Sequence, residues 1–245
     1  MKRKIKILLL PLIIVFVYLS IFFGVFIFKK GNLTQQEKNI DNAKNTNISE
    51  GLSKNGANYG YAQNSAIQKN SKYSSLFSPK VGNENSKVNV VIFYDFDCIY
   101  SWEEYKILYN VIKKNYNNGY FEFRNFPLES VHPNSRALAN ASMCANEQKK
   151  FLEMFNEIFS NFEDRENGSV DINTAIKEYA KNIELDTMQF NKCMSDLKYD
   201  KIINKDIVDA INFGVEGTPT FFINGQKYPG VITQEAWDGV FKIVK

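Results

Sequence analysis

Residues 217–225 read Gly-Thr-Pro-Thr-Phe-Phe-Ile-Asn-Gly and form the most informative segment of the chain. Its apolar centre, Thr220–Ile223, has the β-branched and aromatic composition of a short strand. Asn224 and Gly225 are the residue pair that favours a tight two-residue hairpin turn. Residues 226–228 are therefore expected to return beside the strand, and the stretch predicts a hairpin near the end of the chain.

A second decisive stretch lies more than a hundred residues earlier. Val88–Tyr94 is a β-branched and aromatic run of strand length, typical of a buried central strand. Asp95-Phe96-Asp97-Cys98 leads out of it, and residues 101–116 then carry apolar side chains at the spacing of one helix face. This pattern places Cys98 at a strand-to-helix junction.

The remaining pattern completes a mixed α/β domain. A strand is expected at residues 120–124 after the helix-ending 117–119, and Thr233 has the chemistry of an N-cap for a closing helix at 233–244. Between these lie helical stretches, at residues 134–162, 171–197 and 201–212. The expected order is β-α-β, a helical insertion, then α-β-β-α.

This order and five motifs resemble the DsbA-like branch of the thioredoxin fold. Residues 93–101, Phe-Tyr-Asp-Phe-Asp-Cys-Ile-Tyr-Ser, resemble the family's F-x-D-F-x-C-P-Y-C segment. The other four matching pieces are residues 124–128 with 132–134, Cys144 to Phe151, Phe190-x-x-Cys193, and 217–225. The resemblance covers roughly Lys80 to Lys245 and implies a thioredoxin-like α/β domain at 80–245 with a helical insertion at about 134–200.

The resemblance also implies roles for particular residues. The Thr218–Pro219 bond is expected to be cis and to face Cys98, with the Thr218 backbone pairing with an extended substrate and Tyr100 also contacting it. Cys144 and Cys193 are expected to pair as a structural disulfide; the alternative is that one of them supplies a resolving thiol. No cofactor is implied.

Cys98 is the candidate nucleophile. A thiolate attacks a disulfide, so a reactive cysteine needs a lowered pKa, and a helix N-terminus favours the anion. Ser101, three residues on, is placed so that its hydroxyl or N–H could reach the sulfur. The alternative is that Cys98 is an inert core residue, as most lone cysteines are.

The active-site segment departs from the family at two positions. The motif is Cys98-Ile99-Tyr100-Ser101, so the second cysteine of C-x-x-C is a serine and the usual proline is an isoleucine. A dithiol oxidase stores its oxidising equivalent in the bond between those two sulfurs, which this motif cannot form. The sequence therefore predicts disulfide isomerisation or monothiol exchange, unless Ser101 is an artefact or an engineered trap of a C-x-x-C enzyme.

The other chemistry-bearing residues carry weaker expectations. Asp95 and Asp97 could include a buried carboxylate that tunes proton transfer at the thiol, but solvated acids are the favoured interpretation. His132 is the sole histidine, which leaves little for a His-based zinc site or a Ser-His-Asp centre, and no metal is expected. Followed by Pro133, it is expected to help enter a helix rather than act as a base.

The first 30 residues predict a membrane anchor. Ile7–Phe28 is 22 residues of almost uninterrupted apolar sequence, about 33 Å as a helix, with four bases before it and two after. The positive-inside rule then puts the N-terminus in the cytoplasm and the rest outside. An uncleaved anchor at 1–30 is favoured over a cleaved signal peptide because no Ala-x-Ala site follows.

Residues 31–79 predict a flexible polar tether. Asn, Gln, Ser, Lys and Gly dominate, and the few apolar residues show no period. The first 30 residues hold six bases and no acid, so the remaining 24 bases and 27 acids leave the rest of the chain at −3. Nothing in that balance predicts nucleic-acid binding.

Together these features predict a membrane-anchored, extracytoplasmic thiol–disulfide exchange protein acting through Cys98 alone. Its expected partners are exported proteins with cysteines, and in addition a membrane redox partner or a small thiol. The alternative is a redox-silent relative that keeps the groove as a peptide-binding or chaperone module. Both retain Cys98, so cysteine content does not separate them.

Overall fold

The computed structural model describes residues 72–168 and 170–242. The expected membrane anchor and nearly all of the expected tether lie outside these ranges. Within the two ranges, no helix is long and apolar enough to cross a bilayer.

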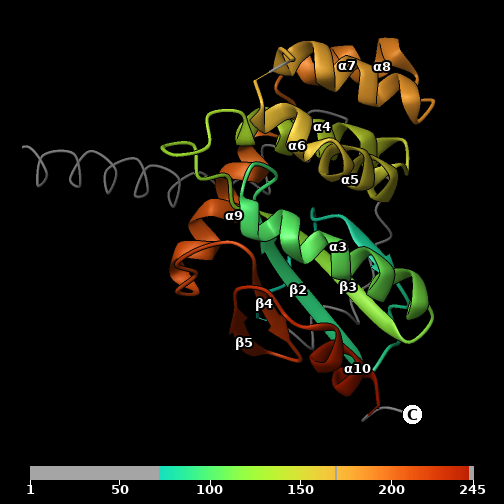
Figure 1. Ribbon diagram of the computed structural model, residues 1–245, viewed down its shortest axis with the longest axis vertical. Coiled ribbons are helices and arrows are strands. Elements are labelled where there is room, and N and C mark those ends of the chain that lie inside the picture. The colour runs from blue at the N-terminus through green and yellow to red at the C-terminus, as the bar shows by residue number, and fades with distance from the viewer. Residues whose placement is uncertain (1–71, 169, 243–245) are drawn as a thin grey trace, which may run out of the picture. The chain divides into compact units, whose positions relative to one another are not determined.

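A five-stranded sheet forms the centre of the domain (Figure 1). Its strands in chain order are β1 (Lys80–Gly82), β2 (Val88–Tyr94), β3 (Gly119–Asn125), β4 (Thr220–Ile223) and β5 (Gln226–Pro229). In space the order is β1-β3-β2-β4-β5, with β2 and β3 parallel and the other three pairs antiparallel. The register pairs Phe93 with Thr220, so the carboxyl end of β2 meets the start of β4.

Helices cover the sheet and extend past one end of it. They are α3 (Ile99–Lys114), α4 (Ser135–Glu147), α5 (Phe151–Ser160), α6 (Phe162–Glu166), α7 (Ile172–Asn182), α8 (Thr187–Ser195), α9 (Asp200–Asn212) and α10 (Gln234–Lys242). Figure 1 shows α3 and α10 lying over one face of the sheet, with α4 to α8 gathered beyond one end of the strands. The helical insertion is thus a separate layer beside the carboxyl end of β2, which leads to Cys98.

Both faces of β2 are buried, which explains its unbroken apolar sequence. Val90 and Ile92 point into the larger cluster of buried side chains, while Val91 and Phe93 belong to a second cluster with Phe222. Alternate residues of a strand point to opposite faces, so the two clusters lie on opposite sides of the sheet. The expected buried central strand is confirmed.

Local signals fixed several element ends as expected. Asn224 and Gly225 have φ of 48° and 85°, the paired positive values of a tight hairpin turn. Thr233 Oγ1 accepts a hydrogen bond from the Ala236 N–H at 3.3 Å, at the start of α10. The expected helix at 134–162 is instead broken between α4 and α5, where Lys149 has a φ of 60°. Strand β1, only three residues long, was not predicted.

The domain begins earlier than expected. Residues 72–79 were assigned to the polar tether, yet Tyr73 stacks on Phe222 with ring centroids 3.8 Å apart. Arg124 donates to the Tyr73 carbonyl oxygen at 2.7 Å, and the Ser75 N–H donates to the buried Glu122 carboxylate at 2.5 Å. These long-range contacts, which local composition does not reveal, attach the segment to β3 and β4.

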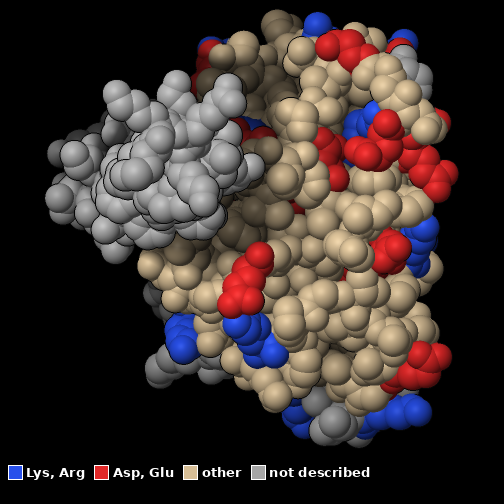
Figure 2. Space-filling model, turned by 60° about the vertical axis from the view of Figure 1, so that its left-hand side comes forward, with Lys and Arg blue, Asp and Glu red and all other residues tan. Residues whose placement is uncertain are grey.

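Most of the face that Figure 2 presents is uncharged, and both Lys or Arg and Asp or Glu side chains are scattered over it. No continuous basic stripe crosses this face.

Candidate active site

Cys98 lies where β2 gives way to α3. The chain leaves β2 at Tyr94, turns through Asp95–Asp97, and places Cys98 as the N-cap residue of α3. The Cys98 N–H donates to the Asp95 carbonyl at 3.2 Å, and the Cys98 carbonyl accepts the first helical hydrogen bond, from Trp102, at 3.0 Å. The sulfur therefore sits at the positive end of the α3 dipole, where an anion is favoured.

The thiol contacts the proline loop directly. Cys98 Sγ lies 3.2 Å from the Thr218 carbonyl oxygen, to which the S–H donates. The Thr218–Pro219 bond is cis in the structure, as the resemblance implied. The two segments that the sequence singled out, 120 residues apart, therefore meet at one point.

Ser101 does not occupy the place expected of it. Its hydroxyl oxygen accepts a hydrogen bond from the Asp95 N–H at 3.4 Å and makes no hydrogen bond to Sγ within the described part of the chain. Ser101 is buried on the inner face of α3. Its side chain braces the turn that carries Cys98, instead of stabilising the sulfur directly.

The Asp95 carboxylate makes most of the side-chain contacts that hold this turn. Its side chain is 2% exposed, and Oδ1 accepts the Asp97 N–H at 2.9 Å while Oδ2 accepts the Leu128 N–H at 2.8 Å. His132 Nδ1 lies 2.8 Å from the same Oδ2. The favoured expectation of a solvated acid was wrong for Asp95, because its partners come from a loop more than 30 residues later.

Asp97 was also expected to be solvated and is buried. The Arg165 Nε of α6 lies 3.6 Å from its Oδ1, and Arg165 Nη2 also donates to the Phe96 carbonyl at 3.1 Å. Burial raises the pKa of Asp97, and the Arg165 guanidinium opposes that rise. A side chain of the helical insertion therefore holds the active-site turn in place.

His132 does more than enter a helix. Its carbonyl accepts the Ser135 N–H at 3.1 Å, as expected of a helix-entry residue. Its ring, however, contacts Asp95 and so joins the loop before α4 to the active-site turn. No local sequence pattern predicts this contact, because the two residues are 37 positions apart.

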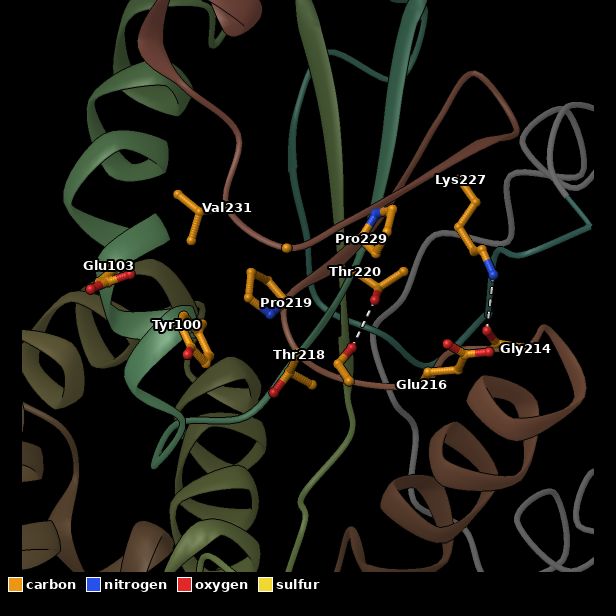
Figure 3. Close-up of a pocket in the computed structure, with 12 residues that line it drawn as sticks. Tyr100, Glu103, Gly214, Glu216, Thr218, Pro219, Thr220, Lys227, Pro229 and Val231 are labelled. Atoms are coloured by element: carbon orange, nitrogen blue, oxygen red, sulfur yellow. Dashed lines mark hydrogen bonds between the residues drawn. The ribbon is translucent and has the colours of Figure 1, made fainter.

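A groove of about 540 Å³ lies beside the proline loop. Figure 3 shows Thr218 and Pro219 between Tyr100, Glu103 and Val231 on the α3 side and Glu216 with Lys227 on the other. Tyr100 is 59% exposed, and Ile99 and Val231 are exposed nearby, which gives the rim an apolar surface. The Thr218 hydroxyl is buried and has no hydrogen-bond partner among the described residues.

The expected substrate-contacting residues therefore come together. Tyr100, Thr218 and Pro219 all line the groove, while Cys98 touches it through the Thr218 carbonyl. Sequence reasoning did not single out Glu103, Glu216 or Lys227, which also line it. Exposed charged residues carry no periodic signal, so only the folded arrangement identifies them.

The other two cysteines lie in the insertion. Cys144 of α4 and Cys193 of α8 form a disulfide, with Cα atoms 5.8 Å apart across 49 positions of sequence. Cys98 is the free cysteine. The described residues hold no group of three His, Cys, Asp or Glu side chains placed to bind a metal ion.

Comparison with known proteins agrees with this geometry. The family model described as thioredoxin matches residues 74–242. The thiol-disulfide exchange protein alpha-DsbA2 of Wolbachia pipientis superimposes with a TM-score of 0.59 at 23% identity, over 70% of this chain and 89% of that one. A periplasmic thioredoxin-like protein from Salmonella enterica serovar Typhimurium gives 0.53 at 19%, over 68% and 89%.

A curated relative is much longer than this chain. The Na(+)/H(+) antiporter NhaA 3 of Salinispora tropica is 28% identical over 155 residues, which is 63% of this chain. The match covers 23% of the antiporter, so this similarity concerns under a quarter of that protein.

Proposed function

Because this chain belongs to the thioredoxin family and has the fold of DsbA-like thiol–disulfide exchange proteins, we propose that it rearranges disulfides through Cys98 alone. The observation that carries the proposal is the contact between Cys98 Sγ and the Thr218 carbonyl, at the edge of a groove able to hold an extended peptide. The nucleophile and the substrate platform are thereby in contact.

The reaction begins when the Cys98 thiolate attacks one sulfur of a client disulfide. A bond forms between Cys98 and that sulfur, the client disulfide breaks, and its second sulfur leaves as a thiolate. The α3 N-terminus stabilises the attacking anion, and the groove holds the client backbone beside Thr218.

Because the motif has no second cysteine, a thiol from outside the motif must release the client from the mixed disulfide. A client thiolate attacks the mixed disulfide, forms a new client disulfide and returns the Cys98 thiolate, so no net electrons are transferred. A small thiol such as glutathione can attack the Cys98 sulfur instead, so that the client sulfur leaves as a thiolate and Cys98 is joined to the small thiol. A second small thiol then attacks that bond, which returns the Cys98 thiolate and releases the two small thiols as their own disulfide. Either route avoids an intramolecular resolving step, which Ser101 cannot perform.

The site of action follows from the N-terminal sequence. Membrane anchoring through residues 1–30, with the domain on the extracytoplasmic side, is supported by the 22-residue apolar run and its flanking bases. In that setting the clients are exported proteins with cysteines. The proposed partners also include a redox protein of the membrane that exchanges disulfides with Cys98.

A second candidate function is a redox-silent peptide-binding module. The observation in its favour is that Cys98 does not line the groove and is only 6% exposed. In that case the groove binds clients without covalent chemistry.

The deciding experiment is client exchange before and after Cys98 is alkylated by iodoacetamide. With Cys144 and Cys193 oxidised, Cys98 is the sole thiol of the chain, so incorporation of one label per chain reports on it alone. We expect the alkylation, or Cys98→Ala, to abolish rearrangement of a client with scrambled disulfides. Client handling that neither change alters, with peptide binding retained, supports the binding module instead.

A further inference from the structure

Glu104 is a buried carboxylate for which the exchange reaction has no use. It lies on α3, the helix that begins at Cys98, and is 1% exposed. Oε1 accepts the Trp237 indole N–H at 2.9 Å, and Oε2 accepts the Ile232 backbone N–H at 2.6 Å. One side chain thus joins α3 to α10 and to the loop between β5 and α10.

That loop forms one wall of the groove. Gly230 and Val231, which directly precede Ile232, both line it. The Gly230 N–H donates to the Pro219 carbonyl at 2.8 Å. A short chain of contacts therefore runs from the Glu104 carboxylate through residues 230–232 to the proline loop that faces Cys98.

Both donors to Glu104 are neutral. Three helices pack on α3 and carry charged residues. These are Glu153 and Glu157 of α5, Glu163, Asp164, Arg165 and Glu166 of α6, and Glu235, Asp238 and Lys242 of α10. None of them pairs with Glu104, and Asp238 instead pairs with Lys114 at 3.1 Å. Burial without a counter-charge raises the pKa of Glu104 to about 7.

The two donors differ in freedom to move. Trp237 is fully buried and packs edge-to-face on Phe221 of β4, with ring centroids 5.5 Å apart. Ile232 belongs to a loop whose neighbour Val231 is exposed. A protonated carboxyl no longer offers two anionic acceptors. Because Trp237 is held by packing, the hydrogen bond from the Ile232 N–H is the one that weakens.

We propose that Glu104 is a positioning residue whose ionised carboxylate holds the 230–232 loop against Pro219, and that its protonation loosens this wall and weakens client binding. The client part rests on the proposed function, since it assumes that the groove receives peptides. The loop part does not, because the loop and Glu104 are parts of the same folded chain.

The first test follows the loop without any client. The full chain, labelled with ¹⁵N at tryptophan and valine, is titrated between pH 5.5 and 8.5, with the Trp237 indole assigned through a Trp102→Phe variant. We expect the Trp237 indole and the Val231 amide to shift with one common midpoint. Glu104→Gln should abolish both shifts, while Glu235→Gln, a change at an exposed carboxylate of α10 outside the groove, should preserve them.

A second variant covers the case in which Glu104→Gln does not fold. Trp237→Phe removes one donor to the carboxylate, so the midpoint of the Val231 amide should move to higher pH. The absence of any titration, or an indole that titrates while the Val231 amide does not, overturns the proposal.

The second test adds a client. A disulfide-free extended peptide is bound to the Cys98→Ser variant, which removes the ionisation of Cys98. We expect at least about fivefold weaker affinity at pH 6 than at pH 8, and no pH dependence once Glu104→Gln is added. Reciprocity then requires bound peptide to lower the Val231 midpoint by at least about 0.7 pH unit.

The two tests separate the two proposals. Peptide that fails to bind at any pH contradicts the groove function, while the titration of the loop still decides the role of Glu104. Peptide that binds equally at both pH values overturns the regulatory role and leaves the groove function standing.

Discussion

Cys98 experiences two opposing influences. The N-terminus of α3 favours its thiolate, whereas the Thr218 carbonyl oxygen 3.2 Å away accepts a hydrogen bond that only the thiol can donate. A client that pairs its backbone N–H with Thr218 would occupy that acceptor. Client binding and thiol ionisation should therefore favour one another.

Replacing Ser101 tests whether its hydroxyl stabilises the thiolate. Because Ser101 Oγ accepts from the Asp95 N–H and does not donate to the sulfur, Ser101→Ala should leave the alkylation midpoint of Cys98 nearly unchanged. The lost hydrogen bond should lower the free energy of unfolding by about 1 kcal/mol. Alkylation rates across pH and urea denaturation measure the two effects, and a large upward shift of the midpoint contradicts the assignment.

The site residues that the sequence predicted lie in local motifs, whereas the role of the residue that it missed depends on contacts with distant parts of the chain. Cys98 and Pro219 stand in local motifs, so they could be predicted. Asp95 was judged solvated because an acid after a strand is usually exposed, and its burial depends on Leu128 and His132. Contacts made across tens of residues leave no local pattern.

The same distinction holds for the elements. The hairpin and the buried strand β2 follow from composition and turn chemistry, and the structure contains both. The break at Lys149 does not, because helix-forming residues continue on both sides of it. Strand β1 exists because β3 offers an edge, not because three residues prefer to be extended.

The Glu104 carboxyl, which joins α3 to α10, makes the free energy of unfolding depend on pH. The pKa of Glu104 is about 7 in the fold against an ordinary 4.5, so between these values the folded chain keeps a proton that the unfolded chain has released. The contribution of Glu104 to the free energy of unfolding is therefore fully present below pH 4.5 and is lost as the pH rises through 7. The loss amounts to about 3 kcal/mol, from about 1.4 kcal/mol per pH unit.

Urea denaturation of the wild type and of Glu104→Gln at pH 5 and pH 8 measures that loss. The free energy of unfolding of the wild type should fall relative to the variant between the two pH values. If the difference in free energy of unfolding between the wild type and Glu104→Gln does not change with pH, the raised pKa of Glu104 is contradicted.

The disulfide between α4 and α8 belongs to the insertion alone. Its removal in a Cys144→Ala/Cys193→Ala variant should lower the free energy of unfolding by up to about 4 kcal/mol, the chain-entropy value for a loop of this size. The alkylation midpoint of Cys98 should stay the same. A mixed disulfide between Cys98 and either partner, found by mass spectrometry in the wild type, contradicts a purely structural role.

At the scale of the whole molecule, the proposed topology can be tested by reporters. A reporter active only outside the cytoplasm, fused after Lys245, should be active in the full chain and inactive when residues 1–30 are deleted. The protein should fractionate with membranes and resist extraction by high salt, because an apolar span is held by burial and not by charge. Release of a shortened, soluble form indicates a cleaved signal peptide instead.

The attachment of residues 72–79 also has a mechanical consequence. A pull arriving from the chain before Tyr73, as membrane anchoring would produce, first loads the Tyr73 contacts with Phe222 and Arg124, and then the bond from Ser75 to Glu122. Next in line is β1, a three-residue strand at the edge of the sheet. Tension is thus taken up first by contacts on β3 and β4 and then by the short edge strand. None of these contacts involves the Cys98 turn, so the turn is not loaded directly.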